Sequence, residues 1–159
     1  MKVIAINGSP HPQGNTFHAL KTIGEELKKE NIEFEILQVG SQNIHGCMGC
    51  NMCFRNKNEK CVITTDSFNE LLQKIKDVDG IILGSPVHFS GIAGTMKCFL
   101  DRAFYVSGLT ETGSVTRSVQ QLLLFVVQEV RTHLTGCIII SRILKCLFPH
   151  LITGTSSTG

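Results

Sequence analysis

A short apolar run at the start of the chain ends in a loop of glycine and small polar residues, and this combination limits the possible folds most strongly. Residues 2–7 read Lys-Val-Ile-Ala-Ile-Asn, and residues 8–16 read Gly-Ser-Pro-His-Pro-Gln-Gly-Asn-Thr. The run is typical of a strand buried in a parallel sheet. The glycines let backbone N–H groups converge on an anion such as phosphate at the start of a helix. Alternatively, the loop only caps that helix, through Asn15 or Thr16.

Strand-like and helix-like segments then alternate. Further strands are predicted at residues 33–39 and 78–84, and a helix follows each of the three strands. The apolar positions of these helices are Phe17, Leu20, Ile23 and Leu27; then Phe68, Leu71, Leu72 and Ile75, after a cap at Asp66; then Ile92, Met96, Phe99, Leu100, Ala103 and Phe104. We assign Lys97 and Arg102 to the polar face of the third helix. The alternation predicts an α/β fold with a parallel sheet covered on both faces, in which ligands bind beyond the carboxyl ends of the strands.

Length and charge exclude several classes of protein. A chain of 159 residues fits one domain. Its net charge of only +2 gives no general attraction to nucleic acid or to acidic membranes. The apolar run at the start is too short for a signal peptide or a membrane span. We therefore expect a cytoplasmic protein that binds neither nucleic acid nor membrane.

Four of the seven cysteines lie close together, with the spacing C-x2-C-x2-C-x7-C. They are Cys47, Cys50, Cys53 and Cys61. In a reducing compartment such a cluster indicates metal or redox chemistry. Closely spaced thiolates suit an iron–sulfur cluster, because one tight loop can hold three corners and nearby chain the fourth. Structural zinc, free thiols and a redox-active dithiol remain as alternatives. Cys98, Cys137 and Cys146 lie among apolar residues and are interpreted as small core residues.

A second glycine-containing loop follows the third strand, and with the first loop it carries a resemblance to a known family. Residues 84–91 read Gly-Ser-Pro-Val-His-Phe-Ser-Gly, and residues 96–102 read Met-Lys-Cys-Phe-Leu-Asp-Arg. Over residues 1 to about 107, the chain resembles the flavodoxin-like NAD(P)H-dependent FMN reductases, and most of all their iron–sulfur flavoprotein branch. The resemblance implies a flavodoxin-like three-layer sandwich with a central parallel sheet, and a core at residues 1–108 that includes the cysteine cluster at 46–61.

The resemblance also assigns roles to individual residues. Ser9, His11, Asn15 and Thr16 would hold the FMN phosphate, and Pro86, Val87, His88, Phe89 and Gly91 would lie along the isoalloxazine ring. His88 stands where the family usually has tyrosine, and His11 is equally interpreted as a solvated loop residue. The family's iron–sulfur branch uses the cysteine motif for a [4Fe–4S] cluster, which here would be held by Cys47, Cys50, Cys53 and Cys61.

The resemblance stops near Gly108, so the C-terminal part at 109–159 is expected to be incomplete or aberrant. Segments 122–127 and 138–140 have strand-like composition, and the Ser/Thr-rich tail at 153–159 is predicted to be disordered. Relatives carry an Arg-Arg-x-Gly-Gly loop after their fourth strand. A one-base slip of the reading frame at 120–130 can spell an apolar strand followed by such a loop. We therefore favour a frameshift over a divergent C-terminal region.

Three functions follow from the resemblance. The first is an NAD(P)H-dependent FMN oxidoreductase, with hydride passing from NAD(P)H to the flavin and electrons passing on to the cluster or another acceptor. The second is a non-catalytic electron carrier that receives electrons from a ferredoxin. The third is an inactive product that has lost its closing loop. Relatives commonly form dimers or tetramers, which implies a homo-oligomer if the C-terminus is intact.

Overall fold

The computed structural model describes residues 1–107 and 123–126, which lie within the compact unit Met1–Glu129. Strands β1 (Lys2–Asn7), β2 (Glu33–Gln38), β3 (Gly80–Ser85) and β6 (Leu123–Val126) form one sheet, and β4 (Val87–His88) with β5 (Gly91–Ile92) forms a small hairpin. The helices are α1 (Asn15–Lys29), α2 (Met52–Asn56), α3 (Phe68–Lys76) and α4 (Gly94–Ser107).

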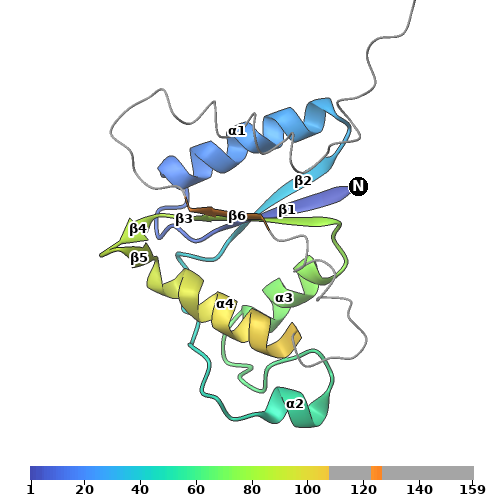
Figure 1. Cartoon of the computed structure of the whole chain (residues 1–159), viewed down its shortest axis with the longest axis vertical. Helices are drawn as coiled ribbons and strands as arrows, with labels where there is room; N and C mark the ends of the chain where they lie inside the picture. The colour runs from blue at the N-terminus through green and yellow to red at the C-terminus, as the bar shows by residue number, and fades with distance from the viewer. Residues whose placement is uncertain (108–122, 127–159) are drawn as a thin grey trace, which may run out of the picture. The chain divides into compact units, whose positions relative to one another are not determined.

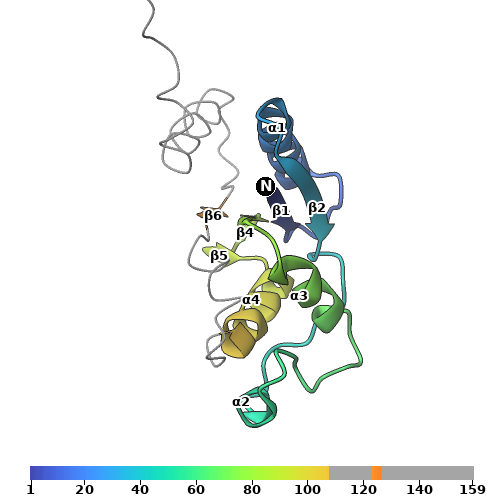
Figure 2. The same ribbon diagram turned by 90° about the vertical axis from the view of Figure 1, so that its right-hand side faces the viewer.

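The main sheet is parallel, with strand order β2-β1-β3-β6. The first strand along the chain is therefore central, and the chain crosses from β2 past β1 to β3. Figure 1 shows α1 on one face of the sheet and α3 and α4 on the opposite face, and Figure 2 shows the same layers from the side. This is the predicted three-layer arrangement. The strand order reverses between β1 and β3, and open α/β sheets bind ligands at such a topological switch point.

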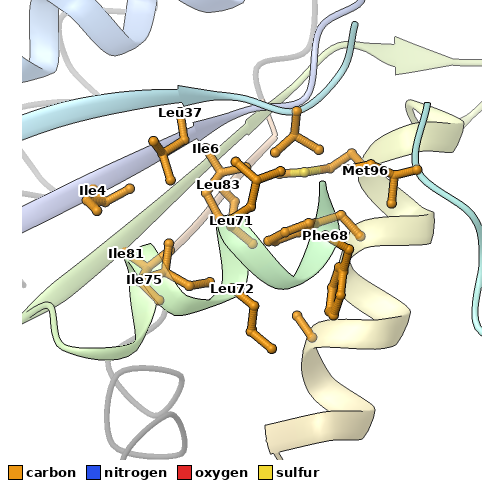
Figure 3. Close-up of a cluster of buried hydrophobic side chains, with 14 of the residues drawn as sticks. Ile4, Ile6, Leu37, Phe68, Leu71, Leu72, Ile75, Ile81, Leu83 and Met96 are labelled. Atoms are coloured by element: carbon orange, nitrogen blue, oxygen red, sulfur yellow. The ribbon is translucent and has the colours of Figure 1, made fainter. Parts of the chain in front are cut away.

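Hydrophobic residues cover both faces of the sheet. On the face of α3 and α4, Ile4, Ile6 and Leu83 pack against Phe68 and Met96 in one buried cluster (Figure 3). On the face of α1, the neighbouring strand residues Val3, Ala5 and Ile82 are buried, as are Leu20 and Leu27 of the helix. Burial on both faces explains why β1 and β3 read as continuous apolar runs rather than as alternating patterns.

Most predicted elements are confirmed with small changes of boundary, and three details were wrong. Ile92 lies in β5, before α4 begins, and Phe104 is 41% exposed rather than part of the buried stripe. Neither Asn15 nor Thr16 caps α1; Gly14 occupies the N-cap position, where no side chain makes a capping hydrogen bond. Strand β6 lies inside the predicted segment 122–127. The other predictions for 109–159, among them the strand at 138–140 and the disordered tail, fall outside the described residues, as do Cys137 and Cys146.

None of the helices in residues 1–107 combines the length and the apolar character that a bilayer span requires.

Candidate functional site

The loops that follow β1 and β3 are joined at the carboxyl edge of the sheet. The backbone N–H of Gly8 donates a hydrogen bond of 2.7 Å to the carbonyl of Gly84. A β-carbon added at Gly84 would lie 2.9 Å from a methyl carbon of Leu20 and 3.0 Å from the Thr16 methyl. Glycine at this position therefore lets the first turn of α1 pack against the end of β3. The structure thus brings both sequence motifs to one place.

A hydrogen-bonded pair of amide side chains, one buried and one half-buried, fixes the start of the first loop. The Asn7 side chain is fully buried, and its Nδ2 donates to Gln38 Oε1 at 2.7 Å. Gln38 Nε2 donates in turn to the Ser9 carbonyl at 2.7 Å, and Asn7 Oδ1 accepts from the Ser9 N–H at 3.1 Å. The roles of Asn7 and Gln38 were not predicted from the sequence. The signal was present, because a polar residue at the end of a buried strand requires a partner.

The loop after β2 approaches this site so closely that a side chain is excluded. A β-carbon at Gly40 would lie 2.2 Å from the carbonyl oxygen of Gly8 and 2.3 Å from that of Ser9. The Gly40 N–H also donates to the Asn7 carbonyl at 3.0 Å. Three strand ends, those of β1, β2 and β3, therefore determine the path of residues 8–16.

The predicted phosphate-binding residues surround the N-terminus of α1. Ser9 and Thr16 are buried, whereas His11 and Asn15 are exposed, and Ser9 Oγ accepts the His11 N–H at 3.1 Å. Because no side chain caps α1, the N–H groups of its first turn are left for another acceptor. The helix carries no acidic residue in this turn and two lysines at its far end. Uncapped N–H groups and hydroxyls at a helix N-terminus are donors that suit the phosphate of FMN.

The predicted ring-contacting residues form the hairpin that follows β3. Val87 pairs with Ile92 and His88 with Gly91. The Ser85 hydroxyl ties the hairpin to α4, since its Oγ accepts the Ala93 N–H at 3.0 Å and donates to the Pro86 carbonyl at 3.0 Å. Pro86 and Val87 are half-buried, His88 and Gly91 are exposed, and Phe89 at the tip is fully exposed with a φ of 44°. The hairpin backbone is thus anchored, while the Phe89 ring does not pack against the rest of the described chain.

The four clustered cysteines line one cavity at the C-terminal end of α4. Cys47 and Cys50 are exposed, Cys53 and Cys61 are half-buried, and Arg102 and Tyr105 of α4 complete part of the wall. Burial raises the pKa of the Cys53 thiol, and the nearby Cys61 and Cys47 raise it further. Tyr105 was not predicted from the sequence; its hydroxyl donates to Asn51 Oδ1, between Cys50 and Cys53.

The four thiols of this cavity are the right ligand type for an iron–sulfur cluster, but their side chains do not converge on one point. Four thiols from one short segment are the ligands that such clusters use. Among the described residues, however, no three His, Cys, Asp or Glu side chains converge closely enough to hold a metal ion. The loop also contains Asn51, Lys57 and Glu59 at positive φ, a conformation that costs about 1 kcal/mol or more for each residue.

One predicted role is corrected at this cavity. Arg102 does not lie on the polar face of α4; its side chain is 1% exposed and forms an ion pair with the equally buried Asp66. It also lies over the ring of Phe68, 4.0 Å from the centroid. The position was readable in the sequence, because Arg102 lies three residues after Phe99 and four before Val106, on the buried side of the helix. The cap at Asp66 is confirmed in part: Asp66 Oδ1 accepts the Phe68 N–H at 3.2 Å, although Ser67 is the N-cap residue.

The carboxyl group of Asp66 stays ionised despite its burial. Burial alone would raise the pKa of Asp66, but the hydrogen bond from Arg102 and the backbone N–H of His45 together outweigh this effect and lower it. The His45 N–H donates to Asp66 Oδ2 at 3.0 Å.

The fold and the two joined loops define a flavodoxin-like α/β protein whose first helix has no side-chain cap at its N-terminus. The model of the NADPH-dependent FMN reductase family matches residues 1–134, and the chain belongs to that family. The curated proteins that it matches are named iron–sulfur flavoproteins.

One relative, an iron–sulfur flavoprotein of Methanocaldococcus jannaschii, is 43% identical over 103 residues, which are 65% of this chain and 52% of the relative. An iron–sulfur flavoprotein of Archaeoglobus fulgidus is 35% identical over 103 residues, or 65% of this chain and 49% of the relative. The chain thus spans about half the length of the curated relatives it matches. Among solved structures, an NAD(P)H:quinone oxidoreductase from Methanothermobacter marburgensis superposes with a TM-score of 0.61 at 14% identity, over 95% of this chain and 98% of the other, which supports the fold.

Proposed function

We propose that the chain binds FMN across the loops that follow β1 and β3 and acts as an NAD(P)H-dependent oxidoreductase. The observation that carries this proposal is the uncapped N-terminus of α1 beside the buried hydroxyl residues Ser9 and Thr16. The hydrogen bond between Gly8 and Gly84 supports it, because it joins the loop after β1 to the loop after β3. Family membership supplies the identity of the ligand.

Two groups of residues would bind the two ends of FMN. Ser9, His11, Asn15 and Thr16 would donate hydrogen bonds to the phosphate, together with the first-turn N–H groups of α1. The backbone and side chains of residues 86–91 would hold the isoalloxazine ring, with Pro86, Val87, His88, Phe89 and Gly91 along it. FMN held there would supply the redox chemistry, with NAD(P)H as the hydride donor. No general acid or base is assigned to this chain.

We propose further that Cys47, Cys50, Cys53 and Cys61 hold a [4Fe–4S] cluster. Their common cavity and the names of the curated relatives support this assignment. Such a cluster would pass electrons singly to a small-molecule acceptor or to a ferredoxin. Structural zinc and free thiols are distinguished from it by iron and acid-labile sulfide analysis of protein reconstituted under anaerobic conditions.

The positions of the two sites favour a second candidate, an electron carrier. Met96 lies against Gly8, whereas Tyr105 lines the cysteine cavity nine residues further along α4. At 1.5 Å per residue the two sites are about 14 Å apart along the helix. Electrons could pass between the two sites over this distance, and the exposed thiols of Cys47 and Cys50 would let a partner protein approach the cysteine site. Steady-state oxidation of NAD(P)H with free FMN or quinone supports the enzyme, and rapid reduction by ferredoxin without turnover supports the carrier.

The C-terminal region and the assembly are proposals as well. We propose that residues 109–159 derive from a shifted reading frame, and that the product of the corrected frame is a homo-oligomer. Resequencing the gene from the codon of Gly108 tests the first point, and light scattering of the corrected protein tests the second. Protein of the present sequence that stays colourless after reconstitution with FMN, iron and sulfide would be an inactive product.

A further inference from the structure

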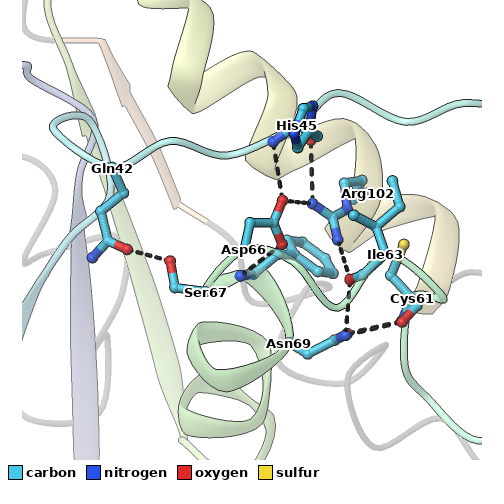
Figure 4. A network of polar contacts seen from close by, with 9 residues as sticks. Gln42, His45, Cys61, Ile63, Asp66, Ser67, Asn69 and Arg102 are labelled. Atoms are coloured by element: carbon cyan, nitrogen blue, oxygen red, sulfur yellow. Dashed lines mark hydrogen bonds and ion pairs between the residues drawn. The ribbon is translucent and has the colours of Figure 1, made fainter.

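The buried guanidinium of Arg102 contacts both ends of the cysteine loop, here defined as residues 46–61. Its Nη1 donates to the carbonyl of His45 at 3.2 Å, and its Nη2 donates to the carbonyl of Ile63 at 3.1 Å (Figure 4). His45 lies two residues before Cys47, and Ile63 lies two residues after Cys61. A single side chain on α4 therefore joins the two places where the cysteine loop leaves the body of the protein.

Neighbouring groups hold this guanidinium in place. Asp66 pairs with Nη1 and also accepts the His45 N–H, so the carboxylate binds both the arginine and the first end of the loop. Asn69 of α3 secures the second end, since its Oδ1 accepts the Cys61 N–H at 2.8 Å and its Nδ2 donates to the Cys61 carbonyl at 2.9 Å. The ring of Phe68 supports the flat guanidinium from one side. The loop ends are thus fixed, whereas Cys47 and Cys50 between them are exposed.

One donor of Arg102 is left over. Its Nε is buried and has no hydrogen-bond partner within the part of the chain that the structure describes. Arg102 also lines the same cavity as the four thiols. A buried donor without a partner is unfavourable and rare in folded proteins, so its position beside the cysteines needs a physical reason. Thiolates and cluster sulfides carry negative charge, and hydrogen bonds to sulfur are a main means by which proteins tune such sites.

We propose that Arg102 is the positioning residue of the cysteine site. Its guanidinium holds the two ends of the cysteine loop together so that the four thiols face one cavity. The inference rests on the proposed function to the extent that it takes the four cysteines as metal ligands. It adds Arg102, which is not one of the four proposed ligands and lies on α4, outside the cysteine loop.

The test uses three variants of the full chain: Arg102→Met, Arg102→Lys and, as a matched control, Lys97→Met. Lys97 is also a cation on α4 and is paired with Asp101, but it is exposed and lies outside the cysteine cavity. Each protein is titrated with Co²⁺ under anaerobic conditions, because the intensity of the thiolate-to-cobalt absorption reports how many thiolates bind the ion. FMN affinity and the thermal midpoint are measured in parallel to report on the rest of the fold.

We expect Arg102→Met to weaken Co²⁺ binding by about 10- to 100-fold and to lower the number of thiolates per ion, with FMN affinity unchanged. Arg102→Lys should fall between Arg102→Met and the wild type, because a single ammonium keeps the charge but lacks the planar fork that reaches two carbonyls. Lys97→Met should match the wild type.

Three outcomes would overturn the inference. If Arg102→Met binds Co²⁺ with the same affinity as the wild type, Arg102 has no positioning role. Parallel loss of Co²⁺ binding and FMN affinity in both Arg102 variants shows that the residue only supports the fold. Absence of thiolate–cobalt absorption in the wild type removes the cysteines as ligands, and thereby this inference, while FMN binding by the same protein would leave the flavin proposal standing.

Discussion

The N–H of Gly8 donates to the carbonyl of Gly84 over 2.7 Å, and this bond joins the loops that follow β1 and β3. The two glycines are 76 residues apart in the sequence, yet β1 and β3 are neighbours in the sheet. Because both loops leave from the same edge, the proposed phosphate donors at the start of α1 and the hairpin after β3 lie at the same edge of the sheet. The predictions below test the parts of this site and the cysteine cavity separately.

Thr16→Val should weaken FMN binding by about tenfold, equivalent to about 1.4 kcal/mol, because it removes a hydroxyl donor to the phosphate. Valine keeps the methyl group that packs against Gly84, so stability should change little. Thr22→Val is the matched control, since Thr22 is exposed on α1 and donates to the His18 carbonyl within the same helix. Quenching of flavin fluorescence measures both affinities. Equal affinity in the two variants would remove Thr16 from the phosphate site.

Gly40→Ala should destabilise the protein by about 1–3 kcal/mol, because its β-carbon would overlap the backbone of Gly8 and Ser9. FMN affinity should fall with it, since the phosphate loop has to move. Gly94→Ala serves as the control: a β-carbon at this first residue of α4 meets no atom within 4 Å. Urea unfolding of the two variants should therefore differ in midpoint, with Gly94→Ala at or above the wild type. A tolerated Gly40→Ala would contradict the close approach.

Asp66→Asn should lower stability at neutral pH by about 3–5 kcal/mol, because it leaves the buried Arg102 charge unpaired. The folded-state pKa of Asp66 is lowered, so its contribution is present above the unfolded value of about 3.9 and is lost as the pH falls through the folded value. The difference between wild type and variant should therefore be constant from pH 7 to about pH 5 and shrink in more acidic solution.

The exposed ion pair between Lys97 and Asp101 provides the control for this pH series. Asp101→Asn should change stability by less than about 1 kcal/mol, as expected for a solvated pair. Denaturant unfolding at a series of pH values gives all three curves. If the difference for Asp66→Asn persisted unchanged to pH 2, the ion pair with Arg102 would not be its origin.

Substitution of any one of Cys47, Cys50, Cys53 or Cys61 by serine should abolish or strongly reduce cluster assembly, because a serine hydroxyl is a poor ligand for iron–sulfur clusters. Cys98→Ser is the control, since Cys98 packs against the hydrophobic core and does not line the cysteine cavity. Iron and sulfide content per chain measures the outcome. Retention of a full cluster in all four single variants would contradict the ligand assignment.

The layers of the fold could be predicted because local patterns and tertiary burial agree. The runs in β1 and β3 are apolar on both faces, and the structure covers both faces. The cysteine spacing likewise predicted the four thiols as a group, and they line one cavity. In both cases the signal lies in one short segment of chain.

The remainder depends on contacts between distant segments, which one sequence does not reveal. Arg102 has the composition of a surface helix position, and only its pairing with Asp66, 36 residues earlier, makes its burial favourable. The cap of α1 was predicted from residue type, whereas the structure leaves the helix N-terminus open. The role of Gln38 also depends on distant segments, because its hydrogen-bond partners Asn7 and Ser9 lie at the end of the neighbouring strand β1.

The most direct test of the central claim is FMN binding and reduction by the purified chain in the absence of oxygen. The account predicts that the protein retains one FMN per chain after gel filtration, and that NADPH or NADH bleaches the flavin absorbance. A variant with all four clustered cysteines replaced by serine should still bind the flavin and be reduced. Protein that retains no FMN at micromolar concentration, although it is folded by circular dichroism, would contradict the account.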